Sequence, residues 1–267
     1  MKSILSKPYD NLVLAYPKAW LALIALIVGV SGLYVKDFRL DASADSLILE
    51  NDRDLRYYRA INKAYGTEDF LVIAYTPFSE LLSKDSLDGL RGLKEDLSKL
   101  KRIKSVVSIL DVPLLNSPRI KISELESNKR NLETPGLDKQ LAKKEFTDSP
   151  IYRKLLASPD GKTTSLLVVY TRDEKYYSLL EVRDDLREKK RSQGFLTPEE
   201  EIRLREVSLE FKQYLAHIQD VQGEEIKKVR SILDKYRDKA KIFLGGLPMI
   251  TSDMVDMIET DLYVFGI

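Results

Sequence analysis

Side chains able to carry out covalent chemistry are scarce in this chain. It contains no cysteine, which excludes disulfides, thiolate catalysis and cysteine-ligated zinc. Its one histidine is His217, so a Ser-His-Asp triad would have to use that residue, and a metal site built from several histidines is impossible. Because His217 lies in a charged helical stretch, we expect it at the surface. We therefore expect no enzyme activity, no catalytic or metal-binding residue and no cofactor.

Three other motifs could bind ions or phosphate but have simpler explanations. Gly245-Gly246 lacks the surrounding pattern of a phosphate-binding loop, so we expect a turn that ends a strand. Asp45 could contact a lipid headgroup or act in gating, although a helix N-cap explains it more simply. The third motif is an acidic cluster near the C-terminus, formed by Asp253, Asp256, Glu259 and Asp261. These carboxylates could guide cations or protons, but we expect them where a helix enters a membrane.

Two aromatic pairs also have a functional and a structural interpretation. Tyr57-Tyr58 and Tyr176-Tyr177 could line a path for lipids, but packing in a core is the more common role of such side chains. No substrate-binding residue can be assigned from the sequence.

The overall charge offers no footprint for nucleic acid, so we expect no nucleic-acid partner. Lys and Arg number 43 against 42 Asp and Glu, which leaves no broad basic excess. Charged residues make up 32% of the chain, above the usual quarter or so, and this predicts a well-solvated surface. The 267 residues are enough for one large domain or two small ones.

The most apolar stretch of the chain runs from Ala19 to Val35, and Ser31 is its only clearly polar residue. As a helix these about 17 residues would rise roughly 26 Å, close to a ~30 Å hydrocarbon core. A cleaved signal peptide would have a shorter apolar region and a small-x-small cleavage site. A core helix of a globular domain would keep a polar face. We therefore expect a retained transmembrane helix over residues 17–36.

Basic residues around this stretch predict its orientation. They are Lys2, Lys7 and Lys18 before it, and Lys36 and Arg39 after it. Because cytoplasmic flanks carry the excess of Lys and Arg, and aspartates accompany the second group, we expect residues 1–16 in the cytoplasm. The domain after Val35 would then be periplasmic or extracellular.

Hydrophobic periodicity predicts four strands and several helices in that domain. The strands are expected at Asp69–Thr76, Ser105–Val112, Thr163–Thr171 and Lys241–Gly245. The helices are expected at Ser43–Tyr65, Ser86–Arg102, Ile122–Asn131, Pro150–Leu156 and Glu174–Lys239. The order β-α-β-β-α-β is that of a ferredoxin-like sandwich, with helices over one face of a four-stranded sheet. The expected class is α+β, with this domain over residues 37–250.

The last helical region is very charged and contains signals that interrupt it. Gln193-Gly194 is expected to end one helix, and Thr197-Pro198 to begin the next with an N-cap and a proline in the first turn. Gln222-Gly223 is a second expected break. The stretch over about residues 183–222 is predicted to be an inserted helical hairpin, whose charges face solvent or contact a partner.

Apolar character rises again at the end of the chain. The residues after the acidic cluster are Leu262, Tyr263, Val264, Phe265, Gly266 and Ile267. We expect residues 251–267 to be the start of a second membrane helix, interrupted by truncation.

Taken in order, these features resemble the RND superfamily of membrane transporters, in particular its MMPL-like and hopanoid-exporter-like branch. The first two motifs are Tyr16-Pro17 at the membrane helix, and DASADSL from Asp41 with the later AYGTED from Ala64 and FLVIA from Phe70. The other two are LASPDGKT from Leu156, preceded by Asp148-Ser-Pro, and IFLGGLPMI from Ile242. The resemblance covers nearly the whole chain.

The resemblance implies the N-terminal part of a bacterial inner-membrane transporter, with its first porter domain in the periplasm. It implies proton-coupled export of hydrophobic or lipid-like cargo. The implied partners are membrane lipids, the cargo and the remainder of the transporter. A homo-oligomer or a periplasmic partner stays open. The charged hairpin departs from the usual compact porter domain, and no proton-relay residue carries over to this chain.

A second hypothesis assigns the chain to single-pass membrane proteins. Its extracytoplasmic domain would then act as a sensor or adaptor, with the charged helices binding a protein partner.

Overall fold

The computed structural model describes residues 16–34, 54, 57, 61, 66, 68–115 and 130–265. The chain divides into two units, Met1–Asp41 and Ala42–Ile267. Several predictions lie outside the described residues: the N-cap role of Asp45, Tyr58, most of the helix over Ser43–Tyr65 and nearly all of the short helix over Ile122–Asn131.

The first unit contains helix α2 (Pro17–Tyr34). No helix in the described part of the chain combines the length and the hydropathy that crossing a membrane requires. The predicted transmembrane helix over 17–36 is therefore wrong, and so is the predicted inner-membrane localisation. The start of a second membrane helix over 251–267 is not tested and stays a prediction. The 18 residues of α2 rise roughly 27 Å, a little less than the ~30 Å thickness of a hydrocarbon core.

The second unit is built on a four-stranded antiparallel sheet. Its strands are β1 (Phe70–Pro77), β2 (Ile103–Val107), β3 (Thr164–Tyr170) and β4 (Ala240–Gly245). They lie in the order β2-β3-β1-β4, and every neighbouring pair is antiparallel. With helices packed against this sheet, the α+β class is confirmed.

The second strand is shorter than the sequence predicts. It ends at Val107, whereas the prediction continued to Val112. The carboxylate of Asp111 accepts hydrogen bonds from the backbone N–H and the hydroxyl of Ser108, which closes a turn instead.

Helix α5 (Lys84–Ser98) begins two residues before its predicted start, because the Ser83 side chain accepts a hydrogen bond from the Ser86 N–H as an N-cap. Helix α6 (Lys139–Asp148) was missed by the sequence analysis. The helix predicted over Pro150–Leu156 is wrong, since these residues form turns next to a bridge between Arg153 and Ala157.

Two long helices connect β3 to β4. Helix α7 (Glu174–Gln193) ends at Gly194, which has a left-handed φ of 80°, so the predicted break is confirmed. Helix α8 (Pro198–Asp234) begins with a capping box between Thr197 and Glu200, also near the predicted position. The second predicted break is wrong, because α8 continues through Gln222-Gly223 for 37 residues, a rise of about 56 Å.

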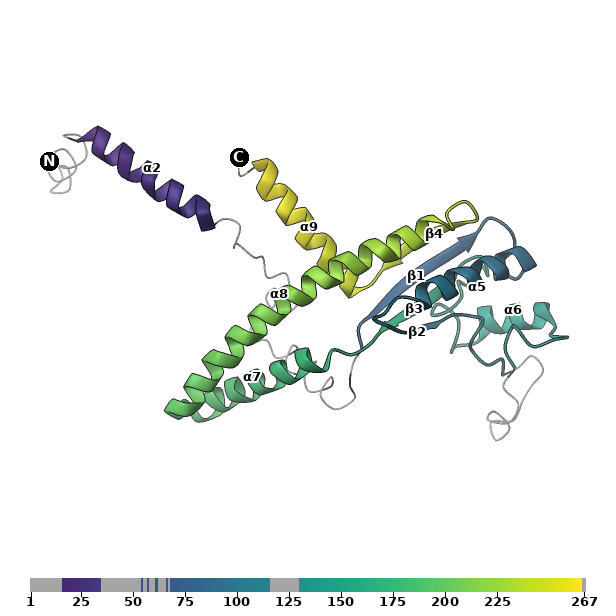
Figure 1. Ribbon diagram of the computed structural model, residues 1–267. Helices are drawn as coiled ribbons and strands as arrows, with labels where there is room; N and C mark the ends of the chain where they lie inside the picture. Colours follow the sequence, from purple (N-terminus) through teal and green to yellow (C-terminus); the bar gives the residue numbers. More distant parts are fainter. Residues whose placement is uncertain are drawn as a thin grey trace, which may run out of the picture. The chain divides into compact units, whose positions relative to one another are not determined.

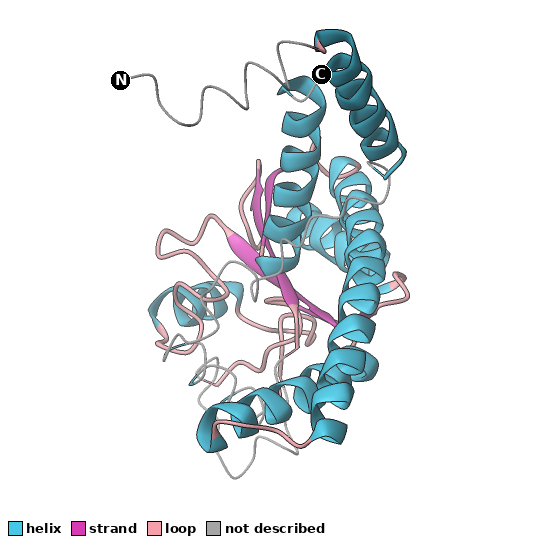
Figure 2. Ribbon diagram, turned by 90° about the vertical axis from the view of Figure 1, so that its left-hand side faces the viewer, coloured by secondary structure: helices cyan, strands magenta, loops and turns pink. Residues whose placement is uncertain are grey.

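The main core lies on one face of the sheet, under α5 and the C-terminal half of α8. Leu90, Leu93 and Leu97 of α5 and Val229 and Leu233 of α8 are buried there. Figure 1 shows both helices over the same face of the sheet, while α7 and the first half of α8 extend beyond it. Figure 2 shows the strands beside this helical layer from a direction turned by 90°.

Two glycines let α5 pack closely on tyrosine rings. A Cβ atom at Gly89 would lie 2.8 Å from the Tyr75 hydroxyl, and one at Gly92 would lie 3.1 Å from the Tyr236 hydroxyl. The Tyr236 hydroxyl also donates a hydrogen bond to Asp96 at 3.0 Å. Burial, together with this bond, raises the pKa of Tyr236 to about 12.

Helix α9 (Leu247–Phe265) follows β4 through Gly245-Gly246. The predicted turn at these glycines is confirmed: Gly246 has a φ of 125°, and a Cβ atom there would lie 2.7 Å from the Phe70 carbonyl oxygen. Arg230 of α8 holds the near end of α9 by pairing with both carboxylate oxygens of Asp253 at 2.8 Å.

Candidate functional site

The face of the sheet opposite α5 and α8, here called the open face, carries an apolar patch. Side chains alternate along a strand, so the residues between the buried ones project to this face. The open-face patch consists of Phe70, Val72, Ala74, Val107, Leu167, Val169 and Phe243. Three of them, Phe70, Val72 and Phe243, are exposed, and the other four are half-buried.

Strand register makes this patch continuous. Phe70 lies opposite Val169, Val72 opposite Leu167, and Val107 opposite Leu167 on the other side. Ala74 lies opposite Phe243 across the β1–β4 pair. Facing side chains in antiparallel strands are direct neighbours, so the apolar surface extends across all four strands. A contiguous apolar surface on a folded domain is a typical mark of a binding site.

The charged residues within the four strands are all basic. None of the four strands contains an acidic residue, whereas Lys104 and Lys241 lie on the two edge strands. Lys104 pairs with Glu68. The ammonium of Lys241 lies 5.0 Å from the ring centroid of Phe243, within the range of a cation–π contact.

A second distinct surface is the α7–α8 hairpin, here called the arm (residues 174–215). It has a small core of its own, in which Leu179, Val207, Phe211 and Leu215 are buried. Arg183 is also buried there, with its guanidinium carbon 4.1 Å from the Phe211 ring centroid. The sequence analysis did not identify this core, because its apolar residues are sparse within a charged stretch.

Polar contacts also join the two helices of the arm along its length. Lys175 pairs with Glu210, Lys189 with Glu200, and Lys190 with Glu201. At the base, the Tyr214 hydroxyl donates to the carboxylate of Asp173, which is also the N-cap of α7. The arm is therefore connected internally from base to tip.

The arm joins the sheet next to three buried or half-buried side chains, here called the root cluster (Arg102, Tyr170 and Glu225). The Arg102 Nη1 atom lies 3.4 Å from the Glu225 Oε2 atom. Burial raises the pKa of Glu225, which Arg102 and then Lys228 partly oppose. Burial also raises the pKa of Tyr170, and the charge of Glu225 adds to that effect.

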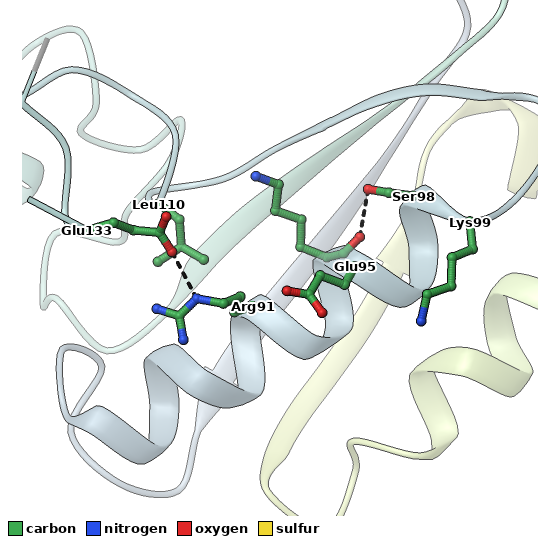
Figure 3. Close-up of a pocket in the computed structure, with 7 residues that line it drawn as sticks. Arg91, Glu95, Ser98, Lys99, Leu110 and Glu133 are labelled. Atoms are coloured by element: carbon green, nitrogen blue, oxygen red, sulfur yellow. Dashed lines mark hydrogen bonds and ion pairs between the residues drawn. The ribbon is translucent and has the colours of Figure 1, made fainter.

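A shallow depression of about 380 Å³ lies on the outer side of α5 (Figure 3). Arg91 on its wall donates to Glu133 at 2.9 Å and to Asp88 at 2.6 Å. The other two cations of its lining, Lys94 and Lys99, pair with Asp111 and Asp96. Because these positive charges are already neutralised, the depression is a poor candidate for binding an anion.

The structure does not bring the residues singled out from the sequence into one site. His217 is exposed on α8, with its ring centroid 6.4 Å from that of Tyr214. Tyr176 packs against the arm core, and its ring centroid lies 5.4 Å from that of Phe211. Tyr57 is exposed. The acidic cluster lies along α9. Within the described residues, no group of three or more acidic or histidine side chains could hold a metal ion.

No protein-family model and no curated protein matches this chain. The resemblance to RND transporters therefore stays a prediction, as does the absence of enzyme activity.

Proposed function

We propose that the α+β unit is a binding module of the porter type found in RND transporters, and that its open face contacts hydrophobic or lipid-like cargo. The proposal concerns binding by this unit. The membrane helix expected from the sequence forms no part of it.

The topology supports the porter type. Strands β1 and β2 are both antiparallel to β3, so they run parallel to each other with β3 between them. Strands β3 and β4 are likewise both antiparallel to β1, which separates them. Two βαβ units that are each split by a strand of the other make up the ferredoxin-like sandwich. In this chain the second crossover is the unusually long α7–α8 pair.

The observation that carries the proposal is the open-face patch. A sheet in a two-layer domain buries one face under helices and normally presents polar side chains on the other. Here the second face presents Phe70, Val72 and Phe243 to solvent. Aromatic and aliphatic side chains without charges between them suit a ligand with a large apolar surface.

Titration with a fluorescent long-chain fatty acid tests this function. The 267-residue chain should bind the probe saturably, and the double substitution Val72→Thr with Phe243→Ser should weaken binding at least tenfold. The matched control is Phe195→Ser at the tip of the arm, since Phe195 is 67% exposed and Phe243 is 57% exposed. Probe binding that is absent, or equally weakened by the control, would refute the proposal.

The arm supports a second candidate function, that of an adaptor which binds a protein partner. It extends beyond the sheet core and presents Phe195, Ile202 and Leu209 to solvent. Photo-crosslinking from position 195 and from position 243 distinguishes the two functions. A single protein adduct at 195 alone favours the adaptor, whereas lipid adducts at 243 alone favour the cargo-binding module.

A further inference from the structure

The open face changes from polar to apolar along strand β1. Near the Pro77 end, Thr76 lies opposite Lys241 of β4. The Thr76 hydroxyl oxygen also lies 2.8 Å from that of Thr163, the residue before β3. At the other end, Phe70 lies opposite Val169. At ~3.4 Å per residue, the rise from Thr76 to Phe70 is about 20 Å, so the face has a polar end and a long apolar remainder.

The Lys241 side chain extends over this face. Lys241 and Phe243 are both exposed, and they alternate with the buried Ala240 and Ile242, so they project to the open side of the sheet. The Lys241 ammonium lies 5.0 Å from the ring centroid of Phe243. The positive charge is therefore located at the boundary between the polar end and the open-face patch.

The two lysines of the edge strands differ in their pairing. Lys104 of β2 pairs with Glu68. Among the described residues, Lys241 has no ion-pair partner, although its side chain reaches across the open face. The charge of Lys104 is neutralised by its own neighbour, whereas that of Lys241 is available to an anionic ligand.

The threonine pair adds a hydrogen-bond donor beside Lys241. When two hydroxyls share a hydrogen bond, one of them donates and the proton of the other remains to donate to a third group. Side chains of residues that lie opposite each other in antiparallel strands are direct neighbours, as Thr76 and Lys241 do. One ammonium and one hydroxyl proton suit a singly charged acceptor with two oxygens, which describes a carboxylate.

We propose that the open face binds a long-chain fatty acid in one orientation. The carboxylate pairs with Lys241 and accepts a hydrogen bond from the Thr76–Thr163 pair, and the acyl tail lies over the open-face patch towards Phe70. This inference rests on the proposed function, and it adds the class of cargo. Apolar contact favours any acyl chain equally, so the selection of an anionic lipid over a neutral one comes from Lys241.

A pair of fluorescent ligands with identical tails tests the selection. The 267-residue chain is titrated with a pyrene-labelled fatty acid and with its methyl ester at pH 7.5. The acid should bind about fivefold more tightly than the ester, the scale of one exposed charge pair, and the ratio should shrink in about 1 M NaCl. Lys241→Gln should lower the ratio to about one by weakening only the acid, and Lys241→Arg should keep it.

The matched control is Lys104→Gln, which removes the other edge-strand lysine and should keep the wild-type ratio, because Lys104 is already paired. A lysine that only protects the sheet edge would alter aggregation and leave the ratio unchanged. If the wild type binds acid and ester equally, the cargo-binding module stands and the selection of an anionic lipid is overturned. Binding of neither ligand would refute the proposed function itself.

A photoreactive group at the far end of the acyl tail tests the orientation. After irradiation, mass spectrometry should locate the adducts near Phe70 and Val169, at the apolar end of the face. Lys241→Gln should spread the adducts over both ends, because it removes the group that fixes the carboxylate. Wild-type adducts concentrated around Pro77 would overturn the orientation.

Discussion

The core beneath the sheet and the core of the arm are stabilised by different interactions. The sheet core joins apolar side chains from four strands and from helices α5, α6 and α8, and Leu71, Ile73, Leu93 and Leu233 are completely inaccessible. The arm core has four buried apolar residues, a buried arginine over Phe211 and several ion pairs. Apolar burial adds up with area, whereas exposed ion pairs contribute about 0–1 kcal/mol each. The arm should therefore be the less stable region and should be able to unfold on its own.

The largest expected loss of stability comes from truncating the sheet core. Leu93→Ala should lower the free energy of unfolding by about 2–5 kcal/mol, because it leaves a cavity under α5. Urea titration followed by circular dichroism measures this, with Leu209→Ala as the control, since Leu209 is exposed on the arm. The control should stay within about 0.5 kcal/mol of the wild type. If both variants lose the same free energy of unfolding, the assignment of Leu93 to the core and of Leu209 to the surface is wrong.

Phe211→Ala should lower the free energy of unfolding of the arm by about 3 kcal/mol, without a comparable loss in the sheet core. Hydrogen exchange should accelerate over residues 174–215 and stay slow in β1 and β3, since the sheet core does not use Phe211. If the strands lose protection to the same extent as the arm, the two cores are a single cooperative unit.

Adding a methyl group at Gly89, where α5 meets β1, should lower the free energy of unfolding by about 1–3 kcal/mol. In Gly89→Ala the new Cβ atom would lie 2.8 Å from the Tyr75 hydroxyl, and overpacking outweighs the gain in helix propensity. Tyr75→Phe should restore stability in the double variant, because this buried hydroxyl has no hydrogen-bond partner among the described residues. The readout is the melting temperature of all four proteins of the cycle. If the effects of the two substitutions simply add in the double variant, the contact with the Tyr75 hydroxyl is not the cause of the destabilisation.

The smallest expected effect is at the root cluster. Burial raises the pKa of Glu225 in the folded state above its value in the unfolded state. Protonated Glu225 therefore contributes to stability below the unfolded-state pKa, and this contribution is lost as pH rises through the folded-state pKa. Glu225→Gln should therefore stabilise the protein at pH 7.5 by about 1 kcal/mol, near the lower cost of an unsatisfied buried group. The advantage should disappear below about pH 4. Destabilisation at neutral pH would mean that the attraction of Arg102 outweighs burial.

Local signals in the sequence predicted much of the fold. The buried strand of β1 and the leucine spacing of α5 were recognised, because each pattern repeats with the period of its own element. The break at Gly194 and the capping box at Thr197 were also recognised, since both depend on a few neighbouring residues. Helix α6 was missed, because its polar residues mask a weak apolar side formed by Ala142 and Phe146.

The candidate sites were much less predictable than the elements. The open-face patch depends on strand register, which brings Phe243 next to Ala74 across more than 160 positions of sequence. The root cluster likewise needs α8 to pass beside Arg102. Composition alone described the arm as a charged hairpin and gave no sign of the core inside it.

The sequence by itself determined the α+β class, the order of strands and long helices along the chain, and the break between α7 and α8, because these follow from local periodicity, caps and turn residues. Only the tertiary structure decided that α8 runs unbroken through Gly223, since packing on both sides of a weak position outweighs the local preference to end there. It also decided which sheet face stays open and which residues meet at the root of the arm. Those contacts join residues far apart in sequence, and no local pattern encodes them.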